Sequence, residues 1–270
     1  MATLQNKVIW LTGASSGIGE ALAYELARRG AKLILSARRE DELNRVAENI
    51  INVMGFNEQD VHVLPLDLAD TGSLAHKTDE AILQFGHVDI LINNGGISQR
   101  SLVKDTPVEV DRKLFEVNFF GTVALTKALL PHFLETKQGT FVTITSAVGK
   151  FGSPWRSGYS ASKHALHGFF DSLRAEVHEQ NIKVLLVCPG FIQTNVSINA
   201  LTASGEKLGT MDAATAQGLT AESCAHQIAN AIEKQKEEVL IGGVKEKFGA
   251  FMKRFFPSIF AIMLRKMAVR

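Results

Sequence analysis

The sequence contains only two cysteines, Cys188 and Cys224, among its 270 residues. Two cysteines are too few for a disulfide framework, so we expect both to be small buried side chains in a reducing compartment. The formal net charge is +1, which gives no sign of nucleic-acid binding. No uninterrupted apolar run approaches the ~20 residues of a membrane-spanning helix. The first residues have no charged region or cleavage site, so we identify no signal peptide.

What the sequence does contain is a regular alternation of short apolar runs and longer amphipathic segments. The runs expected to be strands are Val8–Thr12, Leu33–Ser36, Val61–Leu66, Ile90–Asn93, Phe141–Ser146, Val184–Cys188 and Val239–Ile241. They are continuous rather than alternating, which is typical of parallel strands buried on both faces. The segments expected to be helices are Ile18–Arg29, Glu42–Val53, Leu74–Gln84, Leu114–Leu134, Ala161–Val177 and Ala221–Lys234. These repeated units predict an α/β fold, a doubly wound (Rossmann), mostly parallel sheet with helices on both faces.

We expect a single domain over residues 1–244, followed by a tail over residues 245–270. Within the domain, residues 191–219 form a long polar segment after a strand, which is typical of a lid or binding loop. The tail has seven Lys and Arg residues against the single acidic residue Glu246, and its apolar residues recur at steps of three and four. This pattern suits a basic amphipathic helix in a membrane interface, and it suits equally a stripe that packs on the protein's own binding loop or on a neighbouring subunit. Pro257 is expected to divide the tail into two helices.

A glycine-rich turn joins the first predicted strand to the first predicted helix. Cofactor contacts are expected from Gly13, Ser15, Ser16, Gly17, Ile18 and Gly19. Glycines let the backbone approach a pyrophosphate, and the helix N-terminus offers free N–H groups and the positive end of its dipole. The spacing TGxxxGxG resembles the signature of the short-chain dehydrogenase/reductase family, in its compact single-domain branch. The resemblance covers about residues 4–241 and implies an oxidoreductase with a nicotinamide cofactor.

The end of the second predicted strand favours NADP(H) over NAD(H). A carboxylate at this position hydrogen-bonds the ribose 2′-OH of NAD and repels the 2′-phosphate of NADP. The chain has Ala37 there, followed by Arg38, whose guanidinium can bind a phosphate through charge-assisted bonds. The alternative is that Arg38 and Arg39 are solvated residues that open a helix. Glu40 and Asp41 follow and are expected in the first turn of that helix.

A Tyr-x-x-x-Lys pattern at Tyr159 and Lys163 can carry proton chemistry. Residues four apart share one face of a helix, so the phenol and the ammonium can meet over one substrate. The ordinary pKa of tyrosine, about 10, is too high for catalysis at neutral pH, and a nearby cation lowers it. Ser146, at the end of a predicted strand, can hydrogen-bond the substrate oxygen beside Tyr159. Tyr24 is the only other tyrosine and lies on the first predicted helix. Tyr159 is therefore the expected general acid or base.

The family resemblance implies roles for further positions. Asn118 stands where the family has an asparagine that holds a water, which would connect Lys163 to solvent. One pair after the third strand resembles the family pair that holds adenine, although an aspartate there equally suits a helix N-cap. A later segment matches the family's NNAG, and another matches its PG motif, which clasps the nicotinamide carboxamide. The cofactor contacts implied in this way come from Asp67, Leu68, Asn94, Gly95, Tyr159, Lys163, Pro189, Gly190, Ile192 and Thr194.

Several stretches resemble the dehydrogenase/reductase member-7 subgroup, namely Arg156–Tyr159, Lys163–Ala165, Met211–Asp212 and Thr215–Gly218. Members of that subgroup are often membrane-associated. This chain shows no N-terminal hydrophobic anchor, so we expect a cytoplasmic protein with peripheral membrane contact at most. The resemblance also implies a homodimer or homotetramer. We expect no metal, since His164 and His167 lack further ligands and suit a surface or an interface.

These patterns together predict an NADP(H)-dependent oxidoreductase that moves hydride between nicotinamide and a carbonyl or secondary alcohol. The expected substrate is apolar: a steroid, a retinoid, a keto-lipid or a xenobiotic carbonyl. The stretch Phe151–Trp155 would form an apolar wall or, equally, part of the core. The alternative is an NADP-sensing regulatory or scaffold protein with the same fold and little turnover. Intact Asn118, Ser146, Tyr159 and Lys163 favour the enzyme.

Overall fold

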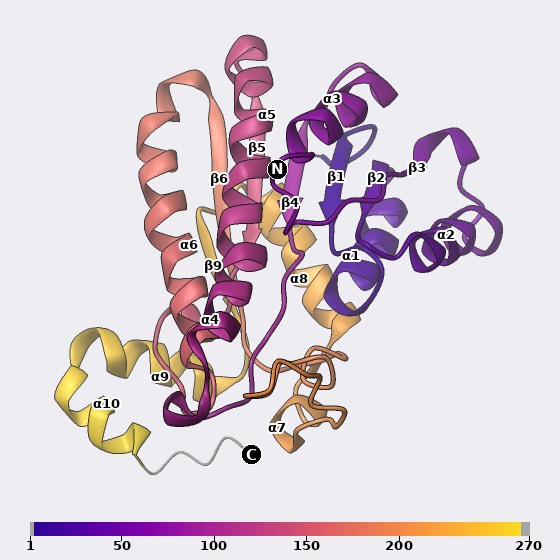
Figure 1. Ribbon diagram of the computed structural model, residues 1–270. Coiled ribbons are helices and arrows are strands. Elements are labelled where there is room, and N and C mark those ends of the chain that lie inside the picture. The colour runs from indigo at the N-terminus through magenta and orange to yellow at the C-terminus, as the bar shows by residue number, and fades with distance from the viewer. Residues whose placement is uncertain (1–2, 266–270) are drawn as a thin grey trace.

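A parallel seven-stranded sheet forms the centre of the computed structural model, which describes residues 3–265 (Figure 1). The strand order is β3-β2-β1-β4-β5-β6-β9, and every pairing is parallel. The strands are β1 (Val8–Thr12), β2 (Lys32–Ser36), β3 (Val61–Val63), β4 (Ile90–Asn93), β5 (Gly139–Ile144), β6 (Ile182–Pro189) and β9 (Glu238–Ile241). The fold is thus the predicted doubly wound single domain.

Helices cover both faces of the sheet. They are α1 (Gly17–Arg28), α2 (Glu40–Glu48), α3 (Leu74–Phe85), α4 (Val108–Phe115), α5 (Thr122–Thr136), α6 (Ser157–Glu176), α7 (Ala213–Ala216), α8 (Ala221–Glu233), α9 (Val244–Phe255) and α10 (Pro257–Leu264). Short 3-10 turns span Glu58–Asp60, Val103–Asp105, Ala147–Gly149 and His178–Gln180. Helices α1, α2 and α8 lie on one face, and α3, α5 and α6 lie on the other (Figure 1).

The core divides into two apolar clusters, one on each face of the sheet. Strand β1 is buried throughout and alternates between them: Ile9 and Leu11 join one cluster, and Val8 and Trp10 join the other. Successive side chains of a strand point to opposite faces, so a strand that packs against an apolar layer on each face must be apolar at every position. This explains why the predicted strands read as continuous apolar runs.

The order of the strands reverses between β1 and β4. Strand β2 lies beside β1 on one side, whereas the chain crosses over to place β4 on the other side. Such a reversal leaves a crevice outside the carboxyl ends of the strands, where open α/β sheets bind ligands. The loops after β1, β4, β5 and β6 all meet there.

Three predicted boundaries were wrong in ways that matter for the site. Strand β5 ends at Ile144, so Ser146 lies beyond the strand rather than in it. The helix expected over Leu114–Leu134 begins at Val108 and includes a π-helical turn at Glu116–Gly121. Strand β3 ends at Val63 rather than Leu66. A π-turn carries an extra residue and often marks a functional position.

The predicted polar loop, residues 191–219, folds over the carboxyl ends of the strands with little regular structure. Two short strands, β7 (Ile192–Gln193) and β8 (Leu219–Thr220), pair with each other at its base, and α7 lies just before β8. Leu201 exchanges backbone hydrogen bonds with Ser98 and Arg100 across the crevice. We call residues 191–219 the lid.

The tail forms two helices, and Pro257 opens the second, as predicted. Phe260 of α10 is buried against Phe151, with ring centroids 5.4 Å apart. Residues 266–270 of the tail lie outside the described residues. Among the described residues, one continuous helical stretch, Val108–Thr136, is long and apolar enough to cross a membrane by length and composition alone. Its α5 part packs Leu125, Leu129 and Phe133 into the core.

Candidate active site

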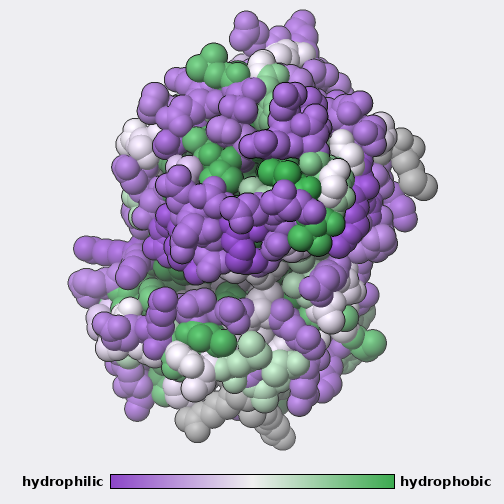
Figure 2. All heavy atoms as spheres, turned by 90° about the vertical axis from the view of Figure 1, so that its right-hand side faces the viewer, coloured by the Kyte–Doolittle hydropathy of each residue, from purple (hydrophilic) through white to green (hydrophobic). Residues whose placement is uncertain are grey.

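A cavity of about 650 Å³ opens at the carboxyl ends of the strands, between the sheet and the lid. Figure 2 shows a furrow across one side of the molecule. All but two of the predicted site residues line this cavity; those that do are Gly13, Ser15, Ser16, Gly17, Ile18, Arg38, Asp67, Leu68, Asn94, Gly95, Ser146, Tyr159, Lys163, Pro189, Gly190, Ile192 and Thr194. Gly19 and Asn118 lie behind its wall.

The glycine-rich turn is shaped so that side chains would not fit. Gly13 has a φ of +67°, and a Cβ there would lie 2.8 Å from Nδ2 of Asn94. A Cβ on Gly19 would lie 2.0 Å from the carbonyl oxygen of Gly13, so this glycine permits the close approach of α1 to the turn. No described side chain caps the N-terminus of α1 at Ser16. The turn therefore leaves free N–H groups at the positive end of a helix, which suits a pyrophosphate.

The NNGG segment after β4 holds the turn in place. Thr12 Oγ1 accepts hydrogen bonds from the backbone N–H groups of Asn94 and Gly95, each at 3.0 Å. Asn94 Nδ2 donates to the carbonyl oxygens of Thr12 and Gly13, at 3.0 and 3.2 Å. This segment thus fixes the turn as well as lining the cavity.

Two arginines follow β2 at one end of the cavity. Arg38 and Arg39 both line it, together with Ala37. Arg39 Nη2 donates to Ser15 Oγ at 3.5 Å, a contact that the sequence did not suggest. Glu40 and Asp41 are exposed in the first turn of α2, as predicted. Asp67 does not cap a helix: its Oδ1 accepts from the backbone N–H of Ala69 in a turn.

Ser146 and Tyr159 face each other across the middle of the cavity. Ser146 lies two residues after β5, and its Oγ accepts from the backbone N–H of Val148 at 3.3 Å and donates to the carbonyl oxygen of Pro189 at 3.4 Å. Tyr159 lies in the first turn of α6 and hydrogen-bonds Ser146. Burial raises the pKa of Tyr159 above its ordinary value, while the bond to Ser146 and the cations Arg156 and Arg100 lower it. Tyr159 is therefore a phenol at neutral pH.

Lys163 lies one turn along α6, with Nζ 5.9 Å from the centroid of the Tyr159 ring. Its Nζ donates to the carbonyl oxygen of Ile144 at 2.9 Å. Burial lowers the pKa of Lys163 to about 8. The groups that lower the pKa of Tyr159 in this structure are Ser146, Arg156 and Arg100. The expected effect of the Lys163 charge on that pKa stays a prediction.

Asn118 lies in the π-turn at Glu116–Gly121 and is fully buried. Its Oδ1 accepts from the backbone N–H of Ile97 at 2.8 Å, and its Nδ2 donates to the carbonyl oxygen of Ile97 at 2.9 Å and to Ser162 Oγ at 3.1 Å. A Cβ on Gly96 would lie 2.9 Å from Asn118 Oδ1 and 3.5 Å from Lys163 Nζ. Asn118 therefore ties the segment after β4 to α6 beside Lys163.

Four further residues around the site were missed by the sequence interpretation. Gln99 is fully buried and accepts hydrogen bonds from the backbone N–H groups of Gly158 and Tyr159, at 2.9 and 3.3 Å. It thereby caps the N-terminus of α6, in the helical turn that carries Tyr159. The other three are Arg100, Arg156 and Asp212, a charged cluster between the cavity and the lid. Gln99 and Arg100 are separated in sequence from their partners, and the chain offers no local signal for them.

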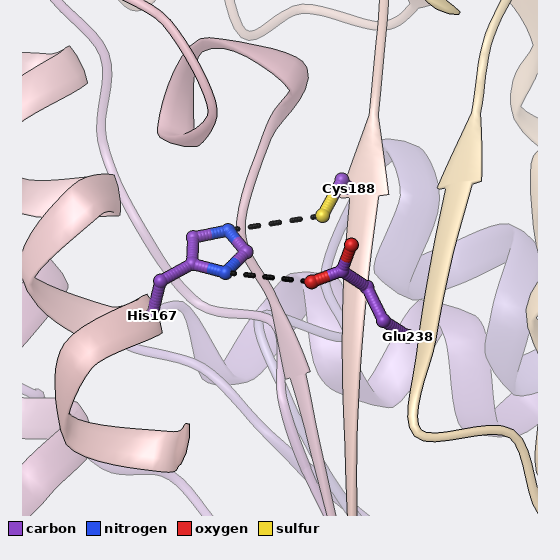
Figure 3. Close-up of side chains that lie close together, drawn as sticks. All are labelled: His167, Cys188 and Glu238. Carbon is purple, nitrogen blue, oxygen red and sulfur yellow. Dashed lines mark hydrogen bonds and ion pairs between the residues drawn. The ribbon is translucent and has the colours of Figure 1, made fainter. Parts of the chain in front are cut away.

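A cluster of three possible metal ligands lies beside the turn Ala147–Gly149. One possible ligand atom each, from His167, Cys188 and Glu238, lies within 4.8 Å of the others. Figure 3 shows the imidazole between the other two: Nε2 is 3.7 Å from Cys188 Sγ, and Nδ1 is 3.8 Å from Glu238 Oε2. One ion cannot use both ring nitrogens, and Lys150 already forms an ion pair with Glu238. Burial lowers the pKa of His167 to about 4 and raises the pKa of the Cys188 thiol to about 11. At neutral pH the imidazole and the thiol of this cluster are therefore both uncharged. His167 is buried within the protein, whereas we expected it at a surface or an interface.

Of the two expectations for the stretch Phe151–Trp155, the structure agrees with the core: the stretch does not line the cavity, and Phe151 packs under Phe260 in a small core with Ala147 and Val148. Within the residues described, the apolar lining of the cavity comes from other segments. It includes Ile97, Val117, Phe191, Val196 and Leu201.

Known proteins agree with this geometry. Residues 7–204 match the family model of the short chain dehydrogenases. A dehydrogenase/reductase SDR family protein 7-like from Anopheles gambiae is 44% identical and is aligned over 98% of this chain and 84% of its own length. Dehydrogenase/reductase SDR family member 7 from Homo sapiens is 43% identical, over 94% of this chain and 76% of its own.

Solved structures share the fold. An alcohol dehydrogenase from Thermococcus sibiricus, complexed with 5-hydroxy-NADP, superposes with a TM-score of 0.76 and 26% identity, over 89% of this chain and 97% of its own. A short chain dehydrogenase/reductase from Burkholderia phymatum gives a TM-score of 0.84 at 22% identity, over 96% of each chain. With the family model spanning most of the sequence and two relatives aligned nearly end to end, the chain belongs to the short-chain dehydrogenase/reductase family of oxidoreductases.

Proposed function

We propose that the protein is an NADP(H)-dependent oxidoreductase that interconverts a carbonyl and a secondary alcohol, with Tyr159 as the general acid or base. The observation that carries the proposal is that one cavity holds both the glycine-rich turn and the Ser146–Tyr159–Lys163 group. A binding fold without turnover has no need for a buried phenol beside a buried lysine. The relative from Thermococcus sibiricus is an alcohol dehydrogenase in complex with an NADP derivative, which agrees with this reading.

The residues present fit a nicotinamide dinucleotide. The free N–H groups of α1 suit its pyrophosphate, and Gly13 and Gly17 keep the turn open where Cβ atoms would intrude. Arg38 and Arg39 suit a 2′-phosphate at the other end of the cavity, because position 37 beside them is an alanine rather than an acidic residue. Bound there, the nicotinamide supplies or accepts the hydride. The remaining parts of the dinucleotide would be held by Asp67, Leu68, Pro189, Gly190, Ile192 and Thr194.

The chain's own residues manage the proton. In the reducing direction, Tyr159 donates its phenolic proton to the substrate oxygen while the hydroxyl of Ser146 polarises the same oxygen. In the oxidising direction, the Tyr159 phenolate takes the hydroxyl proton. Lys163, with its pKa near 8, lies behind Tyr159 and can exchange protons at neutral pH. Asn118 holds the segment that packs beside Lys163, where a relay to solvent would pass.

Substitution of the acid tests this function directly. Tyr159→Phe removes the only phenol in the cavity and leaves the ring, so we expect carbonyl reduction with NADPH to fall by about 10³-fold. NADPH affinity, measured by fluorescence titration, should stay within a few-fold. Tyr24→Phe, at a partly buried tyrosine of α1 that does not line the cavity, is the matched control. Substantial residual activity in Tyr159→Phe would exclude the proposed acid.

The rival function is an NADP-sensing regulatory or scaffold protein. It shares the cofactor site but needs no proton relay. Tight NADPH binding by the wild-type protein, with no turnover on a broad panel of apolar carbonyls, would favour it. The panel should include steroids, retinoids, keto-lipids and xenobiotic ketones, because apolar residues such as Val117, Phe191 and Leu201 line the substrate end. A homodimer or homotetramer is part of the same proposal.

The tail supports a peripheral membrane contact. Phe251 and Phe255 of α9 and Ile259 and Ile262 of α10 are each more than half exposed, and basic residues such as Lys253 flank them. Exposed aromatic and aliphatic side chains with basic neighbours suit an anionic membrane surface. Because Phe260 is part of the core, point variants are better probes than deletion of residues 245–270.

We expect the double variant Phe251→Ser, Phe255→Ser to lose binding to phosphatidylserine-containing vesicles in a flotation assay, while keeping wild-type turnover in solution. Val53→Ser, at an equally exposed apolar position on the other side of the molecule, is the control. Unchanged flotation of the double variant would contradict membrane contact through the tail.

A further inference from the structure

Two buried arginines line the cavity at the end away from Arg38. Arg100 is 9% exposed and Arg156 is 6% exposed, and both contribute to the cavity wall. Arg38 follows β2, whereas Arg156 lies in the segment between β5 and α6, directly before α6, and the sheet order places β1 and β4 between β2 and β5. These arginines are therefore far from the proposed 2′-phosphate contact and belong to the substrate end.

Each of the three guanidinium nitrogens of Arg100 donates to the protein. Its Nε and Nη2 donate to Oδ2 of Asp212 at 3.0 and 2.7 Å, and its Nη1 donates to Ser98 Oγ at 2.9 Å and to the carbonyl oxygen of Gln99 at 2.8 Å. The other oxygen of Asp212 accepts the backbone N–H of Thr215 at 2.8 Å. The single carboxylate of the cluster is thus occupied in holding the lid to Arg100.

Arg156 is left with unsatisfied donors. Its Nη2 is 3.7 Å from Asp212 Oδ2, beyond hydrogen-bond distance, and its Nε and Nη2 have no hydrogen-bond partner among the residues that the structure describes. The face of the guanidinium lies over the Phe191 ring, with Cζ 5.0 Å from the ring centroid. Buried charged donors are normally paired, so the geometry points to a partner that comes from outside the chain.

The charges around this end are mostly positive. Lys113 and Lys207 also line the cavity there, and Glu206 is the acidic residue among its lining residues at this end. Asp212 itself is not part of the lining. A ligand that enters beside Arg156 therefore meets an excess of positive charge.

We propose that Arg156 binds an anionic group, a carboxylate or a phosphate, carried by the carbonyl substrate. A guanidinium with Nε and Nη2 free presents the two-pronged edge that carboxylates and phosphates accept. Arg156 stands three residues before Tyr159 at the N-terminus of α6, so an anion held there places a nearby carbonyl against Tyr159 and Ser146. The substrate class is thus an apolar ketone or aldehyde with an acidic group close to the carbonyl. This inference rests on the proposed function.

Matched substrate pairs test the proposal. One pair is benzoylformate and its methyl ester, and the other is phenacyl phosphate and phenacyl alcohol. In each pair the acidic member and the neutral member share an aryl ketone, and the two pairs distinguish a carboxylate from a phosphate. Reduction is followed by NADPH oxidation in the wild type, in Arg156→Gln and Arg156→Lys, and in Arg112→Gln, an exposed arginine on α4 that serves as the control.

We expect the wild type to favour the acidic member of at least one pair in kcat/KM. Arg156→Gln should lose about 100-fold on that acidic member, mainly through KM, and less than threefold on its neutral partner. Arg156→Lys should lie between, since lysine keeps the charge but not the fork. Arg112→Gln should match the wild type. Equal loss on both members of a pair, or no preference for the acidic member in the wild type, would overturn the proposal.

A binding experiment separates this proposal from the proposed function. Mandelate and methyl mandelate, the reduced products of the first pair, are titrated calorimetrically into the NADP⁺ complex of Tyr159→Phe, with and without Arg156→Gln. If the enzyme turns over none of the ketones, the proposed function fails, and preferential binding of mandelate that Arg156→Gln abolishes still supports the anion site. If neutral ketones are reduced but mandelate binds no better than its ester and phenacyl phosphate is not preferred, the anion site fails alone. A variant that does not fold, judged by circular dichroism, is replaced by Arg156→Lys for the same comparison.

Discussion

The two ends of the cavity are built in different ways. At the cofactor end, the turn after β1 and the segment after β4 are short, and the side chains of Thr12 and Asn94 tie them together by hydrogen bonds to backbone groups. At the substrate end, the wall is assembled from the segment after β4, the start of α6 and the lid, which meet through the side chains of Arg100, Arg156 and Asp212. The first end is made from backbone shape, and the second from side-chain charge.

This difference has a chemical reason. The pyrophosphate is common to NAD and NADP, and glycine backbone can place it with few side chains. The substrate end has to distinguish one ketone from another, and charged side chains on a lid change that preference without changing the sheet. Substitutions at the two ends should therefore fail in different ways.

Among the four changes that compare the two ends, the largest effect is expected at the cofactor end, from Gly19→Ala. The added Cβ would lie 2.0 Å from the carbonyl oxygen of Gly13, so α1 must move away from the turn. A displacement of this kind should lower NADPH affinity by about 100-fold in a fluorescence titration. Gly168→Ala, at a helical glycine with open space around it, is the control. Normal NADPH affinity in Gly19→Ala would show that the turn tolerates a wider spacing than the structure has.

At the substrate end, Asp212→Asn should destabilise the lid without touching the cofactor. It removes the negative partner of Arg100 and leaves two buried guanidiniums side by side, so we expect about 2 kcal/mol less stability on chemical denaturation. NADPH affinity should stay within a few-fold, which Gly19→Ala does not allow. A loss of NADPH binding free energy as large as the loss of unfolding free energy would mean that the two ends are not independent.

A smaller effect is expected from Arg38→Asp. A carboxylate at this position would repel a 2′-phosphate and accept a ribose hydroxyl, so the ratio of kcat/KM for NADPH to that for NADH should fall about tenfold. Arg28→Asp, on the exposed side of α1, controls for the change in net charge. If the ratio does not move, Arg39 rather than Arg38 is the next residue to change, because it reaches Ser15.

The smallest effect is a shift in the pH dependence of alcohol oxidation when Arg156 at the substrate end is replaced. Alcohol oxidation needs the Tyr159 phenolate, so its kcat/KM should rise with pH, while reduction needs the phenol and should hold across the neutral range. Arg156 lowers the pKa of Tyr159. Removing it in Arg156→Gln should therefore raise that pKa and move the rising limb of oxidation to higher pH, a several-fold loss at any fixed pH on the limb. Identical limbs in the wild type and the variant, measured with a neutral alcohol, would show that Arg156 does not reach Tyr159 electrostatically.

The contrast also explains what could be predicted from the sequence. The strands, the flanking helices and the residues of the glycine-rich turn follow local patterns. These patterns predicted the fold correctly, and all but two of the predicted site residues line one cavity. The bond between Arg100 and Asp212 joins residues 112 positions apart, and no periodicity or motif marks it. The burial that lowers the pKa of Lys163 is likewise a result of folding and has no mark in the local sequence. Arg156 is different, because it stands three residues before Tyr159, and helix periodicity places the two side chains on one side of α6.

The packing of the tail ties α9 and α10 to the loops around the substrate end of the cavity. Phe260 covers Phe151 in the small core that includes Ala147 and Val148, directly after Ser146, and the Glu246 carboxylate accepts the backbone N–H of Phe191 at 3.5 Å. The turn after β1 is held instead by Thr12 and Asn94. A displacement of the tail would therefore leave the dinucleotide turn in place and remove support from the loops around Ser146 and Phe191.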